Sequence, residues 1–129
     1  MKNLWVLLGT VFCLSSVQAQ NFPATPLRIV VPFPAGGTTD INARTLSAQL
    51  ERQFGQPLVV DNRAGASGII ACDTVAKAAP DGYTLLFSSA ALSVATTLYG
   101  AKFKFDTLKD LAPVIWTSSV PLVLALHPS

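Results

Sequence analysis

The chain has 129 residues, enough for one small domain or part of a larger one but not for two full domains. Charged residues make up 12% of it and the formal net charge is +2, so it has no concentrated basic surface and we expect no nucleic-acid partner. A hydrophobic fraction of 50% excludes a disordered chain. The composition indicates a globular, apolar-rich domain.

The first 19 residues predict a secretory signal peptide. Lys2 supplies a positive charge, an apolar run covers Leu4–Leu14, and a small-residue pattern ends at Ala19. The apolar run is shorter than the roughly 20 residues of a membrane span, and bulky Phe12 disfavours a lipid anchor on Cys13. We therefore expect cleavage after Ala19, export, and a mature domain at residues 20–129.

Loss of the leader leaves Cys72 as the one thiol, so the mature chain forms no internal disulfide. Cys72 lies in the apolar stretch Ile69–Cys72. This setting favours a buried, inert cysteine over a reactive thiol or an intermolecular bridge.

The first half of the mature chain predicts a strand, a loop and a helix. Leu27–Phe33 is a short apolar run typical of a buried strand, and the prolines and glycines of Pro32–Gly37 interrupt it. Thr38–Asp40 begin a helix that Gly55 ends. One face of this helix carries Ala43, Leu46, Leu50 and Phe54, and the solvent side carries Arg44, Gln49 and Arg52.

Two more strands and a second helix follow. We expect a strand at Pro57–Val60, a polar connector at Asp61–Gly68, a helix at Ile69–Ala79, a turn at Pro80–Gly82 and a strand at Tyr83–Phe87. This alternation predicts an α/β fold, a parallel sheet with helices on both faces.

The remainder gives weaker patterns. A short helix to about Tyr99 and a turn near Leu108–Leu111 are expected, followed by strands at Val114–Thr117 and Val120–Leu126.

Two loops are candidates for ligand binding because ligands of open parallel sheets bind at the carboxyl ends of the strands. The glycines of the first loop let backbone approach an anion closely, and the threonines add hydroxyl donors. Together the loops could hold one carboxylate with neutral donors. The candidate residues are Phe33, Ala35, Gly36, Gly37, Thr38, Thr39 and Asp40 in the first loop, and Ser88, Ser89 and Ala90 in the second.

A purely structural interpretation of the first loop stays open. Gly36 and Gly37 can simply form a tight turn, with Thr38 or Thr39 as the helix cap. The Asp40 carboxylate would repel an anion, so its expected task is to complement the helix dipole and fix the loop by hydrogen bonds. Phe33 can contact an apolar part of a ligand or belong to the core.

Catalytic patterns are sparse. Gly65–Ile69 lacks the second glycine of a G-x-S-x-G elbow, and His127 is the only histidine, close to the last residue of the sequence. Neither a Walker A loop nor G-x-G-x-x-G is present. We therefore expect no enzyme, no metal and no cofactor, and an exported hydrolase using Ser67 or Ser89 is the weaker alternative.

Three motifs resemble one family. Leu27–Asp40 (LRIVVPFPAGGTTD), Val59–Arg63 (VVDNR) and Val75–Leu86 (VAKAAPDGYTLL) are similar to substrate-binding proteins of tripartite tricarboxylate transporters, the Bug family. The similarity continues through Leu108–Val114 and Val120–Val123 near the end of the chain.

The resemblance implies a monomeric periplasmic receptor with two lobes. Such a receptor holds a small carboxylate or amino acid between its lobes, with ordered waters helping to bridge the ligand, and passes it to a membrane transporter of the tripartite type. The family's ligand loops map onto Phe33–Asp40 and Ser88–Ala90.

This sequence departs from the family at several positions. Ala64 and Ser67 stand where the family usually has proline and glycine, and Ala95-Thr96 replaces Asn-Pro, so the loop there is expected to differ from that of the family. Family members are well over twice this length. We therefore expect residues 20–129 to be a first lobe, truncated at the crossover to the second, with a non-functional remnant of such a receptor as the alternative.

Overall fold

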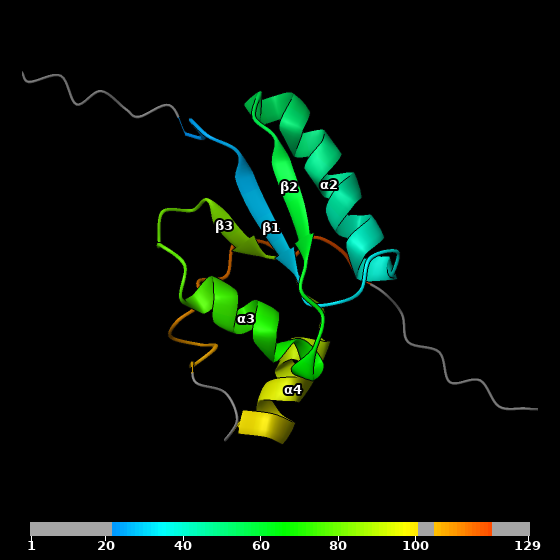
Figure 1. The fold of residues 1–129 in the computed structure, drawn as a ribbon, viewed down its shortest axis with the longest axis vertical. Helices are drawn as coiled ribbons and strands as arrows, with labels where there is room; N and C mark the ends of the chain where they lie inside the picture. Colours follow the sequence, from blue (N-terminus) through cyan, green and yellow to red (C-terminus); the bar gives the residue numbers. More distant parts are fainter. Residues whose placement is uncertain (1–21, 101–104, 120–129) are drawn as a thin grey trace, which may run out of the picture.

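A computed structural model describes residues 22–100 and 105–119 of the chain. Figure 1 shows the elements in chain order. They are β1 (Leu27–Val31), α2 (Thr38–Phe54), β2 (Leu58–Asn62), the 3₁₀ turn η1 (Ala66–Gly68), α3 (Ile69–Ala76), β3 (Thr84–Leu86) and α4 (Ala91–Tyr99).

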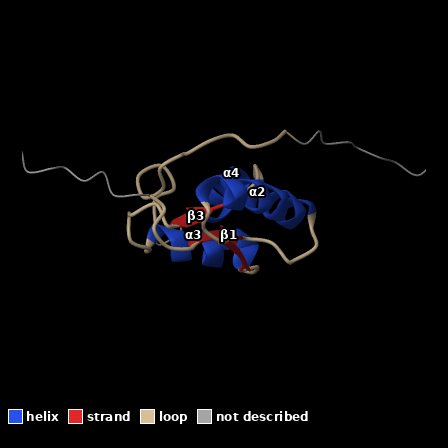
Figure 2. Cartoon of the chain, turned by 90° about the horizontal axis from the view of Figure 1, so that it is seen from above, coloured by secondary structure: helices blue, strands red, loops and turns tan. Residues whose placement is uncertain are grey.

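The three strands form one parallel sheet in the order β2-β1-β3. Ile29 in the central strand pairs in register with Val60 on one side and Leu85 on the other. The connection through α2 runs from β1 to β2, and the connection through α3 runs the opposite way across the sheet, from β2 to β3. Because both connections are right-handed, α2 and α3 lie on opposite faces. Figure 2 shows this arrangement, which confirms the predicted α/β fold with helices on both faces.

The main core lies between β1 and α2. Leu27, Ile29 and Val31 point to this face and pack with Ala43 of α2 and Leu58 of β2. Because side chains alternate along a strand, Val30 points to the opposite face, where α3 lies beside β1 and β3.

Cys72 lies in α3 and is fully buried, as the sequence predicts. Burial raises the pKa of its thiol to about 11. Because the thiolate is the reactive form, this cysteine stays unreactive at neutral pH.

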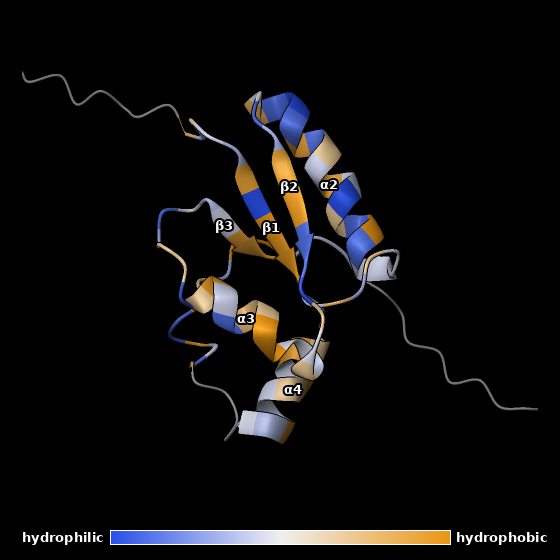
Figure 3. Cartoon of the chain, viewed as in Figure 1, coloured by the Kyte–Doolittle hydropathy of each residue, from blue (hydrophilic) through white to orange (hydrophobic). Residues whose placement is uncertain are grey.

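Helix α2 follows its predicted pattern with two differences. Ala43 is buried and Leu50 packs against the core cluster, but Ser47 is also buried, and Phe54 is 41% exposed in the last turn. Gly55 ends the helix in a left-handed conformation, as predicted. Arg44, Gln49 and Arg52 are exposed, as predicted. Figure 3 shows hydrophilic and hydrophobic bands alternating along α2.

Several predicted boundaries are wrong by a few residues. β1 ends at Val31 rather than Phe33, because Pro32 has no N–H for the ladder. β3 covers only Thr84–Leu86. Helix α3 ends at Ala76 rather than Ala79, and the amides of Lys77 and Ala78 donate to the carbonyls of Asp73 and Val75 just after its end.

The polar connector expected at Asp61–Gly68 is wrong in its first two residues. Asp61 and Asn62 continue β2, paired with Val30 and Val31 of β1. Figure 3 shows β2 changing from hydrophobic to hydrophilic toward its carboxyl end.

The rest of that connector contains η1. Ser67, where the family usually has glycine, adopts a φ of 56°. This is the left-handed region, which glycine adopts at a lower free-energy cost than serine. The conformation of the loop therefore explains why glycine is usual at this position in the family.

The strand expected at Val114–Thr117 is wrong. Residues 111–119 form no regular secondary structure, and Val114, Ile115 and Trp116 are between 78% and 81% exposed. An apolar run becomes a strand only beside a partner strand, and none of the described strands pairs with this one. The turn is present at residues 107–109.

Other predictions fall outside the described residues: the leader at residues 1–19, the strand at Val120–Leu126, and His127. Within residues 22–100 and 105–119, no helix is long and apolar enough to cross a membrane.

Candidate functional site

The two predicted ligand loops leave the same edge of the sheet, from neighbouring strands. The register pairs Val30 with Leu86, and the amide of Phe87 donates to the Val30 carbonyl at 2.9 Å. On the other side of β1, the amide of Arg63 donates to the Val31 carbonyl at 2.8 Å. Figure 1 shows the chain leaving this edge toward α2, η1 and α4. The structure therefore places the starts of both loops side by side.

In the first loop, residues 34–38 are exposed, Thr39 is half-buried, and Phe33 packs against the core cluster. The two glycines differ in conformation. Gly36 has a φ of 86°, whereas Gly37 has an extended backbone with a φ of −77° and is the helix N-cap residue. Helix α2 has no side-chain cap hydrogen bond, so neither Thr38 nor Thr39 caps it.

We expect Gly36→Ala to lower the free energy of unfolding by about 1 kcal/mol, the usual cost of a left-handed conformation for alanine. Gly37→Ala is the matched control. Its new Cβ would meet only the Pro34 carbonyl oxygen, at an ordinary 3.5 Å, so we expect a change within about 0.5 kcal/mol. Urea denaturation of both variants measures this, and equal losses would contradict the assigned loop conformation.

Asp40 organises the first loop from the first turn of α2. This residue is 3% exposed. Its Oδ2 accepts hydrogen bonds from the Gly36 amide at 2.8 Å and from Arg44 Nε at 3.0 Å, and its Oδ1 accepts one from Asn62 Nδ2 at 2.9 Å. Asp40 therefore fixes the loop by hydrogen bonds, as the sequence predicts.

Asn62, the last residue of β2, ties the two ends of the loop together. Its Nδ2 donates to the Phe33 carbonyl at 3.1 Å as well as to Asp40, and its Oδ1 accepts from Arg44 Nη2 at 3.0 Å. Neither Asn62 nor the role of Arg44 is predicted from the sequence. The four-residue spacing of Asp40 and Arg44 on one helix face was the available signal.

These donors hold the pKa of Asp40 well below its ordinary value, at about 2. The hydrogen bond from Arg44 contributes most, followed by those from the Gly36 amide and Asn62. The carboxylate is therefore charged throughout the physiological pH range.

A pKa lowered by folding means that the stabilisation is complete above the ordinary value of 3.8 and is lost as the pH falls toward 2. We therefore expect the Gly36 amide resonance to shift between about pH 4 and pH 2, as its acceptor becomes protonated. NMR spectra recorded across this range measure the shift. In Asp40→Asn the same resonance should stay constant, and a shift of equal size in this variant would contradict the assignment.

The second loop begins directly after β3. Ser88 is half-buried, and Ser89 and Ala90 are exposed. The Ser89 hydroxyl accepts a long hydrogen bond of 3.3 Å from the Ala91 amide, and its carbonyl accepts one of 3.0 Å from the Leu92 amide. These contacts lead the loop into α4.

A separate cluster of charges lies on the other face of β2. Asp61 accepts hydrogen bonds from Arg28 Nε at 3.0 Å and from Arg63 Nε at 2.9 Å. The hydrogen bond from Arg28, followed by that from Arg63, holds the pKa of Asp61 below its ordinary value. Both arginines are thus paired with a carboxylate outside the two loops.

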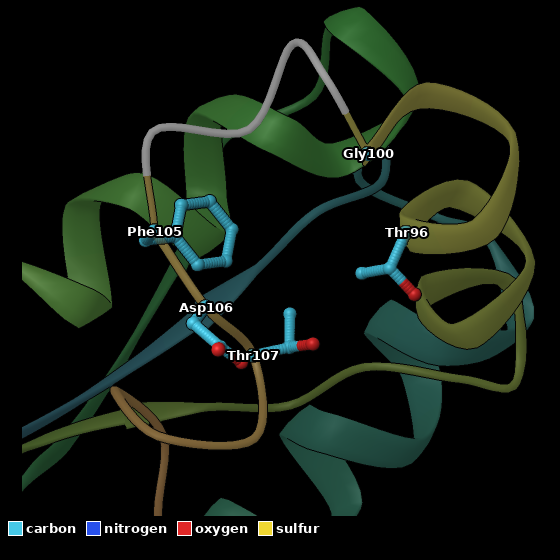
Figure 4. A pocket seen from close by; sticks show the side chains of 5 residues that line it. All are labelled: Thr96, Gly100, Phe105, Asp106 and Thr107. Atoms are coloured by element: carbon cyan, nitrogen blue, oxygen red, sulfur yellow. The ribbon is translucent and has the colours of Figure 1, made fainter.

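An open hollow of about 270 Å³ lies between α4 and the segment after it (Figure 4). Its lining residues are Thr96, Gly100, Phe105, Asp106 and Thr107. It includes none of the predicted ligand residues, and its one carboxylate, that of Asp106, is paired with Lys109 at 3.1 Å. Within the described part of the chain, no three metal-ligating side chains cluster.

Comparison with known proteins gives a consistent assignment. The model of the tripartite tricarboxylate transporter family receptor matches residues 42–129. BugT of Bordetella pertussis is 44% identical over 124 residues, covering 95% of this chain and 38% of BugT. A UPF0065 protein of Bordetella bronchiseptica is 42% identical over 124 residues, covering 94% of this chain and 37% of the relative.

Among solved structures, an R. palustris protein with adipate matches with a TM-score of 0.50 and 49% sequence identity. The match covers 50% of this chain and 22% of that protein. The chain thus spans less than two fifths of the length of the curated relatives that it matches.

Proposed function

The chain belongs to the tripartite tricarboxylate transporter receptor family, and we propose that it forms the first lobe of a periplasmic receptor that binds a small carboxylate or amino acid. In this proposal the receptor passes its ligand to a membrane transporter of the tripartite type. Residues 1–19 direct export and residues 20–129 form the lobe.

One observation carries the proposal: the first loop lies exposed at the carboxyl edge of the sheet, with its only carboxylate already satisfied by three donors. The first amides of α2 have no carbonyl partner within the helix. They point a partial positive charge toward this edge, where an anion is favoured. The second loop starts from the neighbouring strand and adds the Ser88 and Ser89 hydroxyls.

Binding rather than catalysis fits these residues. Ser67 is exposed in the 3₁₀ turn and Ser89 lies at the start of α4. Among the residues that the structure describes there is no histidine to act as their base. The adipate carried by the R. palustris relative supports a carboxylate as the ligand class.

An NMR titration of residues 20–129 with acetate, succinate, citrate and glutamate tests the proposal. We expect the amide resonances of Gly36–Thr39 and Ser88–Ala90 to shift with at least one ligand, while those of Gly55 and Gly82, outside the two loops, stay constant. If no ligand shifts either loop even at several hundred millimolar, where a weak site would be occupied, the proposed site is wrong.

A further inference from the structure

The proposed site places a negative charge beside a negatively charged ligand, and one side chain offsets that repulsion. A loop that binds carboxylates carries a carboxylate of its own, that of Asp40, which is charged although the residue is only 3% exposed. Two of the groups that bind it, the Gly36 amide and Asn62, are neutral. Only Arg44 brings a positive charge, with Nε at 3.0 Å from Oδ2.

We infer that Arg44 determines how many negative charges the ligand can carry, because its guanidinium neutralises Asp40 beside the loop. This inference rests on the proposed function of the loop. Arg44 acts here as a specificity-determining residue through Asp40, and it need not touch the ligand.

The other arginines of the chain are not placed for the same task. Arg28 and Arg63 are paired with Asp61 on the opposite side of β2. Arg52 lies on α2 but eight residues farther along, about 12 Å at the rise of an α-helix. That distance exceeds the roughly 8 Å over which salt screens exposed charges at physiological ionic strength.

Arg44 is also held in place from two sides. Its Nε binds Asp40 and its Nη2 binds Asn62 Oδ1 at 3.0 Å, while half of the side chain remains exposed. The guanidinium therefore stays next to the loop, between the first turn of α2 and the end of β2.

Three variants separate charge from structure. Arg44→Gln removes the charge but keeps an amide donor for Asp40 and Asn62. Arg44→Lys keeps the charge. Arg52→Gln removes the same charge from the same helix at a distance, and it is the matched control.

In the first measurement, each variant is titrated with acetate, succinate and citrate at mildly alkaline pH. Binding is followed through the shifts of the loop amide resonances. The uncompensated Asp40 carboxylate beside the loop repels each charge of the ligand, and in a watery environment this repulsion weakens binding by about two- to sixfold for each ligand charge. We therefore expect the loss in Arg44→Gln to grow from acetate to succinate to citrate, and Arg44→Lys and Arg52→Gln to bind as the original chain does. An equal loss for all three ligands would show a structural role and overturn the inference.

The second measurement needs no ligand. Cationic and anionic nitroxide probes broaden nearby amide resonances according to the local potential. In Arg44→Gln, the amides of Gly36–Thr38 should be broadened more by the cationic probe and less by the anionic one, whereas Arg52→Gln should leave them unchanged. An unchanged balance in Arg44→Gln overturns the inference even if carboxylates bind. A changed balance without any carboxylate binding shows that Arg44 neutralises Asp40 and that the proposed function of the loop is the part that fails.

Discussion

Replacing Ile29 by alanine is expected to lower the free energy of unfolding by about 2–5 kcal/mol, the range for truncating a buried isoleucine. Ile29 is 2% exposed at the centre of the middle strand, where it pairs with Val60 and Leu85. Its side chain faces α2 together with Leu27 and Val31. The main core is small and a domain typically has a free energy of unfolding of only about 5–15 kcal/mol, so this loss is a large share of the total.

Two further variants calibrate this result. Ile29→Val should cost about 0.5–1.5 kcal/mol, because little side-chain volume is lost. Val59→Ala is the control on the neighbouring strand, where the side chain is 54% exposed, and we expect a change near or below about 0.5 kcal/mol. Urea denaturation followed by circular dichroism gives all three values. Similar losses for Ile29→Ala and Val59→Ala would mean that β1 is not the centre of the core.

The central strand and α2 could be predicted because local chemistry decides them. The apolar run of β1 is interrupted by Pro32, and the apolar spacing of α2 ends at Gly55, whose left-handed conformation closes the helix. Proline geometry and glycine freedom act within a few residues, so a sequence displays them directly.

Strand ends depend instead on the partner strand. Asp61 and Asn62 look like a polar connector, yet both extend β2 because the backbone of Val30 and Val31 continues beside them. The opposite error occurs at Val114–Thr117, where an apolar run lacks a described partner strand and stays irregular. Pairing between distant segments decides both cases, and it is not visible within either segment.

The candidate site likewise combines local and long-range contacts. The role of Asp40 could be predicted because a carboxylate in the first turn of a helix acts locally on the dipole and the loop. Asn62 comes from another strand, 22 residues later, and reaches Asp40 only because the register sets it beside Val31. The hydrogen bonds from Asn62 to Phe33 and Asp40 therefore could not be predicted from the sequence and are visible only in the folded structure.

The chain of residues 20–129 is expected to bind a small carboxylate with a dissociation constant of about 1 mM or weaker. Its first loop is exposed over residues 34–38, so a ligand held there keeps contact with water on one side. Each hydrogen bond then contributes roughly 0.5–1.5 kcal/mol, and about three of them stand against an association cost of at least about 4 kcal/mol. A millimolar constant corresponds to only about 4 kcal/mol of binding free energy.

Gly37→Val tests whether this weak binding occurs at the loop. The extended backbone of Gly37 accepts a branched side chain, and the nearest atom to a new Cβ is the Pro34 oxygen at 3.5 Å, so the variant should fold. Its added methyl groups would keep a ligand away from the first amides of α2, and the titration shifts of that loop should disappear. Calorimetry on the unmodified chain decides the affinity. A micromolar constant would contradict the estimate, because the two exposed loops would then supply more binding free energy than three water-accessible hydrogen bonds allow.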